Sequence, residues 1–213
     1  MNAAPHALSL GAELARSLDH ATGRIVPLDV LLRAAEHDLD VPDVAQEALR
    51  ELGWAGIAVG TDDGGLDLDA STQAKLAAVA GRRLLPFAIH GEAFGLAPAL
   101  AAAALGGPLD ELLGGSLRGG AATVDSAGTD GNFTGVSATV AIAPGASLVA
   151  LVGPDACAIL DLAEDPLEVE PAAALDSGQG ARRVTVAGAI DDRRVIREDQ
   201  AQRLRRGWEL AGF

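Results

Sequence analysis

The sequence predicts an α+β fold, with an N-terminal all-α helical bundle, then a small β-barrel or sandwich, then one C-terminal helix. Before residue 119, apolar residues recur at helical spacing. After Gly119 they form short runs rich in Val, Thr and Ile, separated by Gly, Pro, Asp and Asn. From Arg197 the helical spacing returns. We therefore expect a helical domain over residues 1–118, an abbreviated β domain over 119–196, and the start of a further helix over 197–213.

Three amphipathic helices are expected before residue 53. Apolar residues at helical spacing mark them over residues 8–18, 28–35 and 42–52. The first is expected to end before Gly23, and the third begins at Pro42 and ends at Gly53, which suits a left-handed stop. The apolar residues 54–59 are then expected to form a short strand before the turn at 62–65.

The remaining helices of the first half are short or Ala-rich. Asp69 or Ser71 can cap a fourth helix, which stops by Pro86. Ala-rich helices follow as far as Leu105, and another is expected over residues 108–113.

Six strands are predicted in the β domain from β-branched residues between turn-forming residues. They cover residues 121–124, 133–142, 147–152, 156–162, 167–169 and 182–186. Strands of this length and spacing are typical of a small barrel or sandwich.

Composition excludes several classes of protein. The 213 residues are 49% hydrophobic but only 3% aromatic, with no tyrosine, so the core must be built from Ala, Leu, Val and Ile. A net charge of −14 disfavours nucleic acid as a partner. No apolar run is long enough for a membrane span, and the N-terminus lacks an export signal, so a cytoplasmic location is expected. Cys157, the single cysteine, is expected on a buried strand and chemically inert.

Two stretches of sequence resemble the acyl-CoA dehydrogenase family. The first is LRELGWAGIAV at 49–59, with GGL at 64–66 and GRRLLP at 81–86. These segments resemble the family's N-terminal domain in their residue types and their order. The second is TVDSAGTD at 123–130, which resembles the flavin-edge motif Thr-Glu-Pro-x-Ala-Gly-Ser-Asp. The segment GWELAG at 207–212 falls where the family's last helical domain begins, and the rest of that domain is missing from this chain.

The resemblance implies a function in fatty acid metabolism: α,β-dehydrogenation of an acyl-CoA thioester, an oxidoreductase reaction that uses FAD. By this resemblance, Thr123 takes the place of a residue whose backbone and hydroxyl meet the flavin. Thr129 takes that of a hydroxyl residue near the CoA thioester chain, and Gly128 belongs to the same cofactor-binding motif. An ordinary strand-to-loop turn uses the same residue types, and this alternative stays open.

Other positions depart from the family pattern. Val124 and Asp125 replace the motif's Glu and Pro. In the following strand, where the family has Gly-x-Lys-x-Trp-Ile-Thr, Gly135 matches. The Lys, aromatic, Ile and Thr positions hold Ser137, Thr139, Val140 and Ala141. The aromatic ring that lies against the flavin is therefore lost, and FAD binding by this chain alone is not expected.

No catalytic residue can be assigned, because the family's carboxylate base lies in the C-terminal helical domain. One hypothesis is therefore an oligomeric enzyme in which a partner chain supplies that domain. The alternative is a non-catalytic scaffold or binding relative, or a decayed, truncated paralogue that binds no flavin. An exposed apolar area is expected around the β domain and the last helix, where the absent domain would pack.

Four further groupings of residues were considered and given structural explanations. The residues His37, Asp38, Asp40 and Asp43 lack metal-site spacing and are expected to form a solvated connection, so no metal is predicted. His90, two residues before Glu92, is expected at the surface. The segment 178–183 lacks a dinucleotide fingerprint and is expected to be a turn. The arginines Arg203, Arg205 and Arg206 are expected on a solvated helix face.

Overall fold

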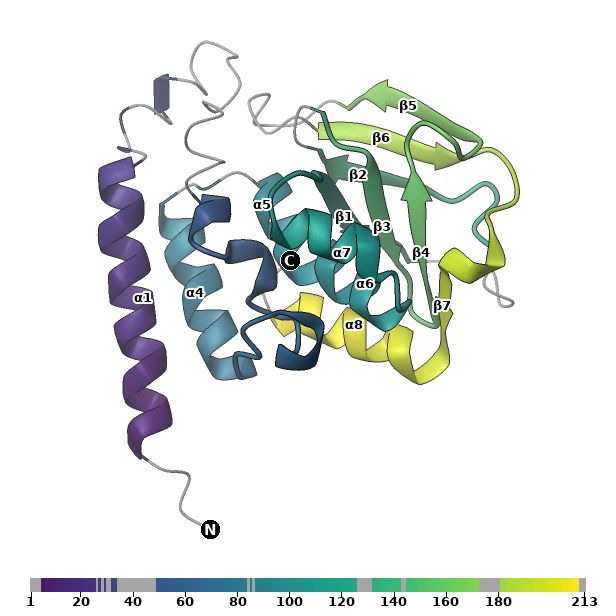
Figure 1. Ribbon diagram of the computed structural model, residues 1–213. Helices are drawn as coiled ribbons and strands as arrows, with labels where there is room; N and C mark the ends of the chain where they lie inside the picture. Colours follow the sequence, from purple (N-terminus) through teal and green to yellow (C-terminus); the bar gives the residue numbers. More distant parts are fainter. Residues whose placement is uncertain are drawn as a thin grey trace.

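The computed structural model describes residues 5–25, 27, 29, 32–33, 49–83, 85, 87–125, 132–142, 145–172 and 181–210. Helices precede a set of strands, and a helix follows them, so the predicted α+β class is confirmed. In Figure 1 the helices of the first half lie on one side and the strands on the other. No described helix combines the length and apolar character that a membrane crossing requires.

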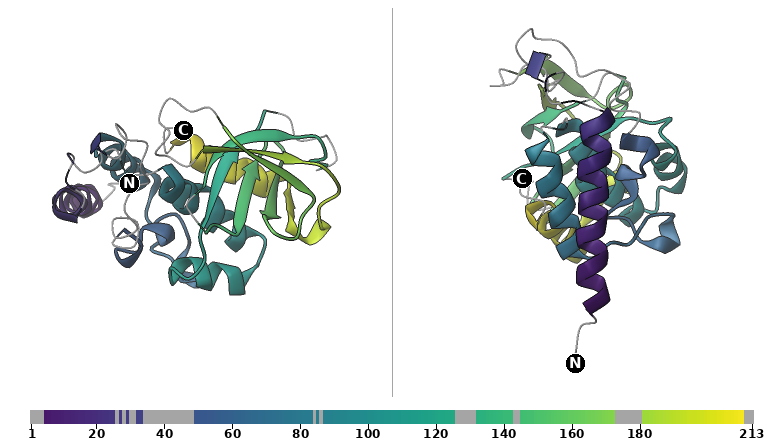
Figure 2. Two further views of the ribbon diagram at one scale, coloured as in Figure 1. Left: turned by 90° about the horizontal axis from the view of Figure 1, so that it is seen from above. Right: turned by 90° about the vertical axis from the view of Figure 1, so that its left-hand side faces the viewer.

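Two helices form the outer part of the helical half. The helix α1 (Pro5–Ile25) lies beside α4 (Ala70–Arg82), farthest from the strands (Figure 1, and Figure 2, left). The prediction that α1 ends before Gly23 is wrong. Arg83, whose Nε donates to Asp19 Oδ1 at 2.7 Å, lies against Gly23, where a Cβ would be 3.2 Å from Nη2. Glycine makes room for the arginine here and does not stop the helix.

The N-cap of α4 is confirmed as Asp69. Its Oδ1 accepts a hydrogen bond from the backbone N–H of Thr72 at 3.1 Å, which satisfies one of the donors that a helix start leaves free. Of the second and third predicted helices, Asp29, Leu32, Arg33 and residues 49–51 are helical and Leu52 lies in a turn; the other residues lie outside the described ones.

The strand predicted over 54–59 is wrong. Residues Trp54–Gly56 form a 3₁₀ helix, η1, and the next residues turn. The returning chain provides the backbone partners: Leu66 N donates to Gly56 O at 2.9 Å and Asp67 N to Val59 O at 2.8 Å. A second short 3₁₀ helix, η2 (Thr61–Asp63), makes this reversal. Among the described residues no strand lies alongside to form a ladder, so an apolar run alone predicted the wrong backbone conformation.

A continuous helical rod lies between α4 and the sheets. It consists of α5 (Phe87–Gly91), the π-helical turn η3 (Glu92–Leu96) and α6 (Ala97–Ala102), and α7 (Gly106–Leu113) follows. Small residues let this rod approach the sheet closely: a Cβ at Gly91 would lie 2.7 Å from the backbone N of Ala121.

The strands form two sheets, and no closed barrel is present among the described residues. The first has the order β1-β3-β4-β7, with β1 (Gly119–Thr123) parallel to β3 (Leu148–Val152) and the other pairs antiparallel. The second is antiparallel, in the order β2-β6-β5. The remaining strands are β4 (Ala156–Asp161), β7 (Val195–Arg197), β2 (Ser137–Ala141), β6 (Ala181–Val186) and β5 (Leu167–Pro171).

The first sheet is buried on both faces. Along β3, Val149 and Leu151 point toward the second sheet, together with Val140 and Val184. The alternate residues of the same strand pack with the helices in the other core cluster. The molecule therefore has three layers: helices, first sheet, second sheet. The six predicted strands are all present with shifted ends, and β7 was not predicted.

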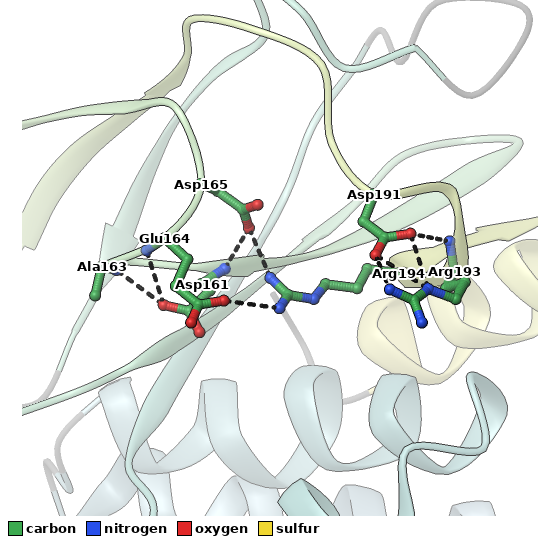
Figure 3. A network of polar contacts seen from close by, with 7 residues as sticks. All are labelled: Asp161, Ala163, Glu164, Asp165, Asp191, Arg193 and Arg194. Carbon is green, nitrogen blue, oxygen red and sulfur yellow. Dashed lines mark hydrogen bonds and ion pairs between the residues drawn. The ribbon is translucent and has the colours of Figure 1, made fainter.

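The last helix, α8 (Glu198–Leu210), packs on the helix-facing side of the first sheet. A polar network fixes the chain just before it (Figure 3). Arg194 reaches Asp165 Oδ2 at 3.1 Å and Glu164 Oε2 at 3.4 Å, and Asp165 also accepts from the backbone N of Asp161 at 2.6 Å. The turn after β4 is thereby tied to the entry of β7 and α8.

Candidate functional site

The end of β1 is where the sequence places its candidate residues. Four buried residues, 119–122, precede Thr123, whose side chain is exposed. The strand is held beyond this point, because Val124 N donates to Val152 O at 3.0 Å. The α8 side chain Arg205 donates from Nη1 to Val124 O at 3.3 Å. Gly128 and Thr129, the other predicted site residues, lie outside the described residues.

A surface cavity of about 530 Å³ opens at this strand end. Its lining is mostly polar and comes from two segments, Val124 with Asp125, and Asn132 with residues 134–137. Two hydrogen bonds hold the second segment in place: Thr134 N donates to Asn132 Oδ1 at 2.9 Å, and Gly135 N donates to Val186 O at 2.7 Å. Gly135 has φ +82°, a left-handed conformation that favours glycine. The cavity therefore has preformed polar walls; Thr123 precedes the lining residue Val124 and is not itself part of the lining.

A buried polar cluster was missed from the sequence. Glu92, in the π-helical turn, accepts from Arg50 Nη2 at 3.2 Å and from Gly119 N at 3.1 Å. Burial raises the pKa of Glu92, which the Arg50 guanidinium and the Gly119 N–H oppose. Because this carboxylate joins three segments inside the core, its role is structural. A lone Arg and a lone Glu 42 residues apart give no sequence signal for such a pair.

His90 is buried, so its predicted place at the surface is wrong. Its ring stacks on Phe94 and lies edge-on to Trp54 at centroid distances of 6.3 and 5.6 Å. Burial lowers the pKa of His90 to about 4. The residue spacing suggested an exposed position because it does not reveal the contact with Trp54, which is distant in sequence.

The single cysteine is confirmed as a buried strand residue. Cys157 lies on β4, and burial raises the pKa of its thiol to about 12, so it carries almost no thiolate. No group of three potential metal ligands exists in the described part of the chain. The predicted turn at 178–183 is described only from Ala181, where β6 starts, and residues 37–43 are not described at all.

The expected apolar area near α8 is not found on its described surface. The exposed residues of this helix are polar or charged, among them Gln202, Arg203 and Arg206. The exposed large hydrophobic residues are Leu32, Leu52, Leu66 and Val169, of which Val169 alone belongs to a strand.

Comparison with solved structures identifies the fold. A variant of the Tcur3481–Tcur3483 steroid ACAD, an acyl-CoA dehydrogenase, matches 96% of this chain and 61% of its own, with 20% identity and a TM-score of 0.67. XiaF from Streptomyces sp., in complex with FADH2 and glycerol, matches 92% and 54%, with 16% identity and a TM-score of 0.60. The ChsE4–ChsE5 complex from Mycobacterium tuberculosis matches 99% and 59%, with 15% identity and a TM-score of 0.60.

The chain has the acyl-CoA dehydrogenase fold. It spans between about half and two thirds of the length of these structures. No family model matches the sequence, and no curated protein matches it either. The resemblance drawn from residues 49–86 and 123–130 is thus confirmed at the level of the fold.

FAD, the cofactor implied by the acyl-CoA dehydrogenase fold, fits the described residues in part. The exposed Thr123 hydroxyl and the polar walls of the cavity can form hydrogen bonds to the polar edge of a flavin ring. The face of the ring finds no aromatic partner there. Every described aromatic side chain is buried, namely Trp54, Phe94, Phe133 and Trp208, and Thr139 lies exposed at the family's aromatic position.

Proposed function

We propose that the chain forms the helical and β part of an acyl-CoA dehydrogenase-like oxidoreductase, which uses FAD and needs a partner chain for its catalytic base. The observation that carries this proposal is the exposed Thr123 at the end of a buried strand, beside a polar cavity, in a fold shared with flavoproteins. We further propose the division at residues 118/119 and 196/197, a cytoplasmic location and an oligomeric state.

In this proposal, Thr123, Gly128 and Thr129 would hold FAD, which would supply the hydride acceptor for the dehydrogenation of the acyl thioester. The chain's own contribution is to bind and orient. Thr123 offers its hydroxyl at the strand end, and Arg205 holds the adjacent Val124 carbonyl, so the exit of β1 has a fixed direction. Gly128 and Thr129 continue the same motif and are proposed to contact the cofactor, and Thr129 the substrate.

In this proposal the catalytic base comes from a partner chain. The general base has to reach the α-proton directly or through one water. Glu92 is not available for this, because its carboxylate is enclosed in the core and accepts from Arg50 and Gly119. Two of the similar structures are complexes named for two chains, Tcur3481–Tcur3483 and ChsE4–ChsE5, which supports a two-chain assembly here as well.

A second candidate function is a scaffold or binding module without flavin, or a decayed paralogue. One observation favours it: no described aromatic ring is exposed to stack on an isoalloxazine ring. A flavoenzyme and a scaffold differ in whether an acyl-CoA can reduce a bound cofactor.

The test is to purify the tagged chain from its native cells together with whatever protein remains bound. Addition of saturated acyl-CoA thioesters of several chain lengths should bleach the flavin absorbance of this preparation under anaerobic conditions. If the complex contains flavin that no acyl-CoA bleaches, the dehydrogenase proposal is wrong. If it contains none, the scaffold candidate replaces it.

A further inference from the structure

The strand β5 leaves one edge of the second sheet open. It is the last strand in the order β2-β6-β5 and pairs with β6 alone among the described residues. In Figure 1 it lies at the upper rim of the strands. Residues 168–171 are all exposed, and Val169 is 45% exposed. Because its backbone groups lack a neighbour on one side, such an edge is a template on which another strand can pair.

The ends of the β5–β6 ladder fix its hydrogen-bond register. Ala187 N donates to Pro166 O at 2.7 Å at one end, and Ala172 N donates to Ala181 O at 3.2 Å at the other. Hydrogen-bonded pairs recur at every second residue of an antiparallel ladder. The even-numbered residues of β5 therefore bond to β6, and the odd-numbered residues direct their backbone groups to the open edge.

The open edge offers more acceptors than donors. Val169 is its centre, with its N–H and C=O both directed outward. The C=O groups of Leu167 and Pro171 point the same way, but Leu167 N is bonded to Asp165 O at 2.8 Å and proline has no N–H. A strand of about five residues, paired antiparallel, would donate hydrogen bonds to all three carbonyls and accept one from Val169.

Two carboxylates flank this edge on one face of the sheet. Side chains alternate along a strand, so Glu168 and Glu170 share a face and Val169 lies on the other. Neither carboxylate has an ion pair within the described part of the chain. Val169 lies opposite Val184 of β6, which is buried between the sheets. An apolar side chain beside Val169 would extend that buried layer, and a cation beside each glutamate would offset its charge.

These charges select among possible partner strands. An antiparallel copy of β5, centred on Val169, would bring Glu168 of one molecule opposite Glu170 of the other, and like charges in that position are destabilising. An acidic strand from any other protein meets the same repulsion. A strand with a basic residue on each side of an apolar one complements both the charges and the apolar centre.

We propose that β5 is a docking edge for an extended basic segment of another protein. The segment pairs antiparallel with Val169 and places a lysine or arginine beside each of Glu168 and Glu170. None of these three residues lines the cavity at the β1 exit. The docking edge can therefore be tested separately from the proposed flavin site.

The probe is the capped peptide acetyl-Thr-Lys-Val-Lys-Thr-amide, titrated into the whole chain and followed through the NMR signals of the backbone amides of residues 168–170. Saturable shifts are expected, with a dissociation constant on the order of 1 mM at low salt. Hydrogen exchange of the Val169 amide should slow at saturating peptide. The acidic peptide with Glu in place of both Lys residues should bind at least about tenfold more weakly.

A methylated peptide separates strand pairing from the general attraction of a cation to a chain of charge −14. Methylation of the central Val nitrogen keeps both positive charges and removes the donor to Val169 O. This peptide should also bind at least about tenfold more weakly than the unmethylated one. Equal affinity of the two peptides would overturn the proposal.

Matched variants test the edge itself. Glu168→Gln and Glu170→Gln should each weaken binding by about twofold to fivefold, whereas Glu13→Gln, the same change of charge at an exposed position of α1, should leave it unchanged. Val169→Pro removes the outward N–H, which edge strands tolerate, and should abolish the shifts of residues 168 and 170 while the β6 amides keep their positions. No saturable shift in the wild-type protein, or equal affinity of Glu13→Gln and both edge variants, would also overturn the proposal.

Discussion

The carboxylate of Glu92 lies 3.2 Å from the guanidinium of Arg50, and the two side chains are only 1% and 3% exposed. Because Glu92 Oε1 also accepts from the backbone N of Gly119 at 3.1 Å, the pair connects the helical half to the first residue of β1. The strand that leads to Thr123 is thus anchored at its start by an ion pair in the core.

Replacement of Glu92 should be strongly destabilising. Glu92→Gln keeps the shape and removes the charge, which leaves the buried Arg50 without its carboxylate and should lower the unfolding free energy by about 3 kcal/mol. Urea unfolding measures this loss. Glu164→Gln, which removes an exposed partner of Arg194, is the matched control and should change stability by less than about 1 kcal/mol. Equal stability of Glu92→Gln and the wild type would contradict the structural role of the pair.

The buried His90 should make stability depend on pH. Burial lowers its folded-state pKa to about 4, whereas the unfolded chain titrates near 6.5. Within that window the unfolded chain binds a proton that the folded chain does not, so the unfolding free energy should fall as pH drops, by about 3 kcal/mol in all. Above the window this contribution is fully present.

The comparison of wild type with His90→Gln isolates this effect. The variant should lose the extra pH dependence between about pH 6.5 and pH 4, while both proteins lose stability at lower pH as groups such as Asp191, whose pKa is lowered to about 2, become protonated. If the unfolding free energies of the wild type and His90→Gln change in parallel between about pH 6.5 and pH 4, His90 is not buried in its neutral form.

Local patterns predicted most of the fold, and the exceptions have identifiable causes. Asp69 was one of two candidate caps, with Ser71, because a single side chain can satisfy a nearby backbone donor, and the structure shows that Asp69 is the cap. The strand expected at 54–59 failed because strand formation depends on a neighbouring strand that local sequence does not reveal. The Arg50–Glu92 pair and the burial of His90 depend on contacts distant in sequence, so no spacing rule could find them. The motif at 123–130 located the end of β1, but not the polar cavity walls contributed by Asn132 and residues 134–137.

Gly95 allows α8 to pack against the helical rod. A Cβ at this position would lie 2.3 Å from both Trp208 Cζ3 and Ala121 Cβ. Gly95→Ala should therefore destabilise the protein by about 1–3 kcal/mol through overpacking. Gly81→Ala, in α4 with no atom near the new Cβ, should instead be neutral or stabilise by up to about 1 kcal/mol. Thermal unfolding of the two variants tests this packing. Midpoint temperatures that shift in the same direction in both variants would contradict it.

Arg205 should act as a positioning residue for the β1 exit. Arg205→Met removes the donor to Val124 O, and amide hydrogen exchange of Val124 and Asp125 should accelerate by about tenfold or less while the core amides keep their protection. Arg206→Met, exposed on the same helix, should leave the exchange of both amides unchanged. Unaltered exchange in Arg205→Met would show that the α8 contact does not hold this segment.

The central claim is that the exit of β1, beside Thr123, is a flavin site completed by a second chain. The most direct measurement is FAD retention by the natively purified complex, compared with the same complex carrying Thr123→Val, a substitution that keeps the β-branched shape and removes the hydroxyl. The account predicts that the wild-type complex retains FAD, and that the variant assembles normally and binds it at least about tenfold more weakly. Equal retention by both complexes, or a wild-type complex without FAD, would contradict it.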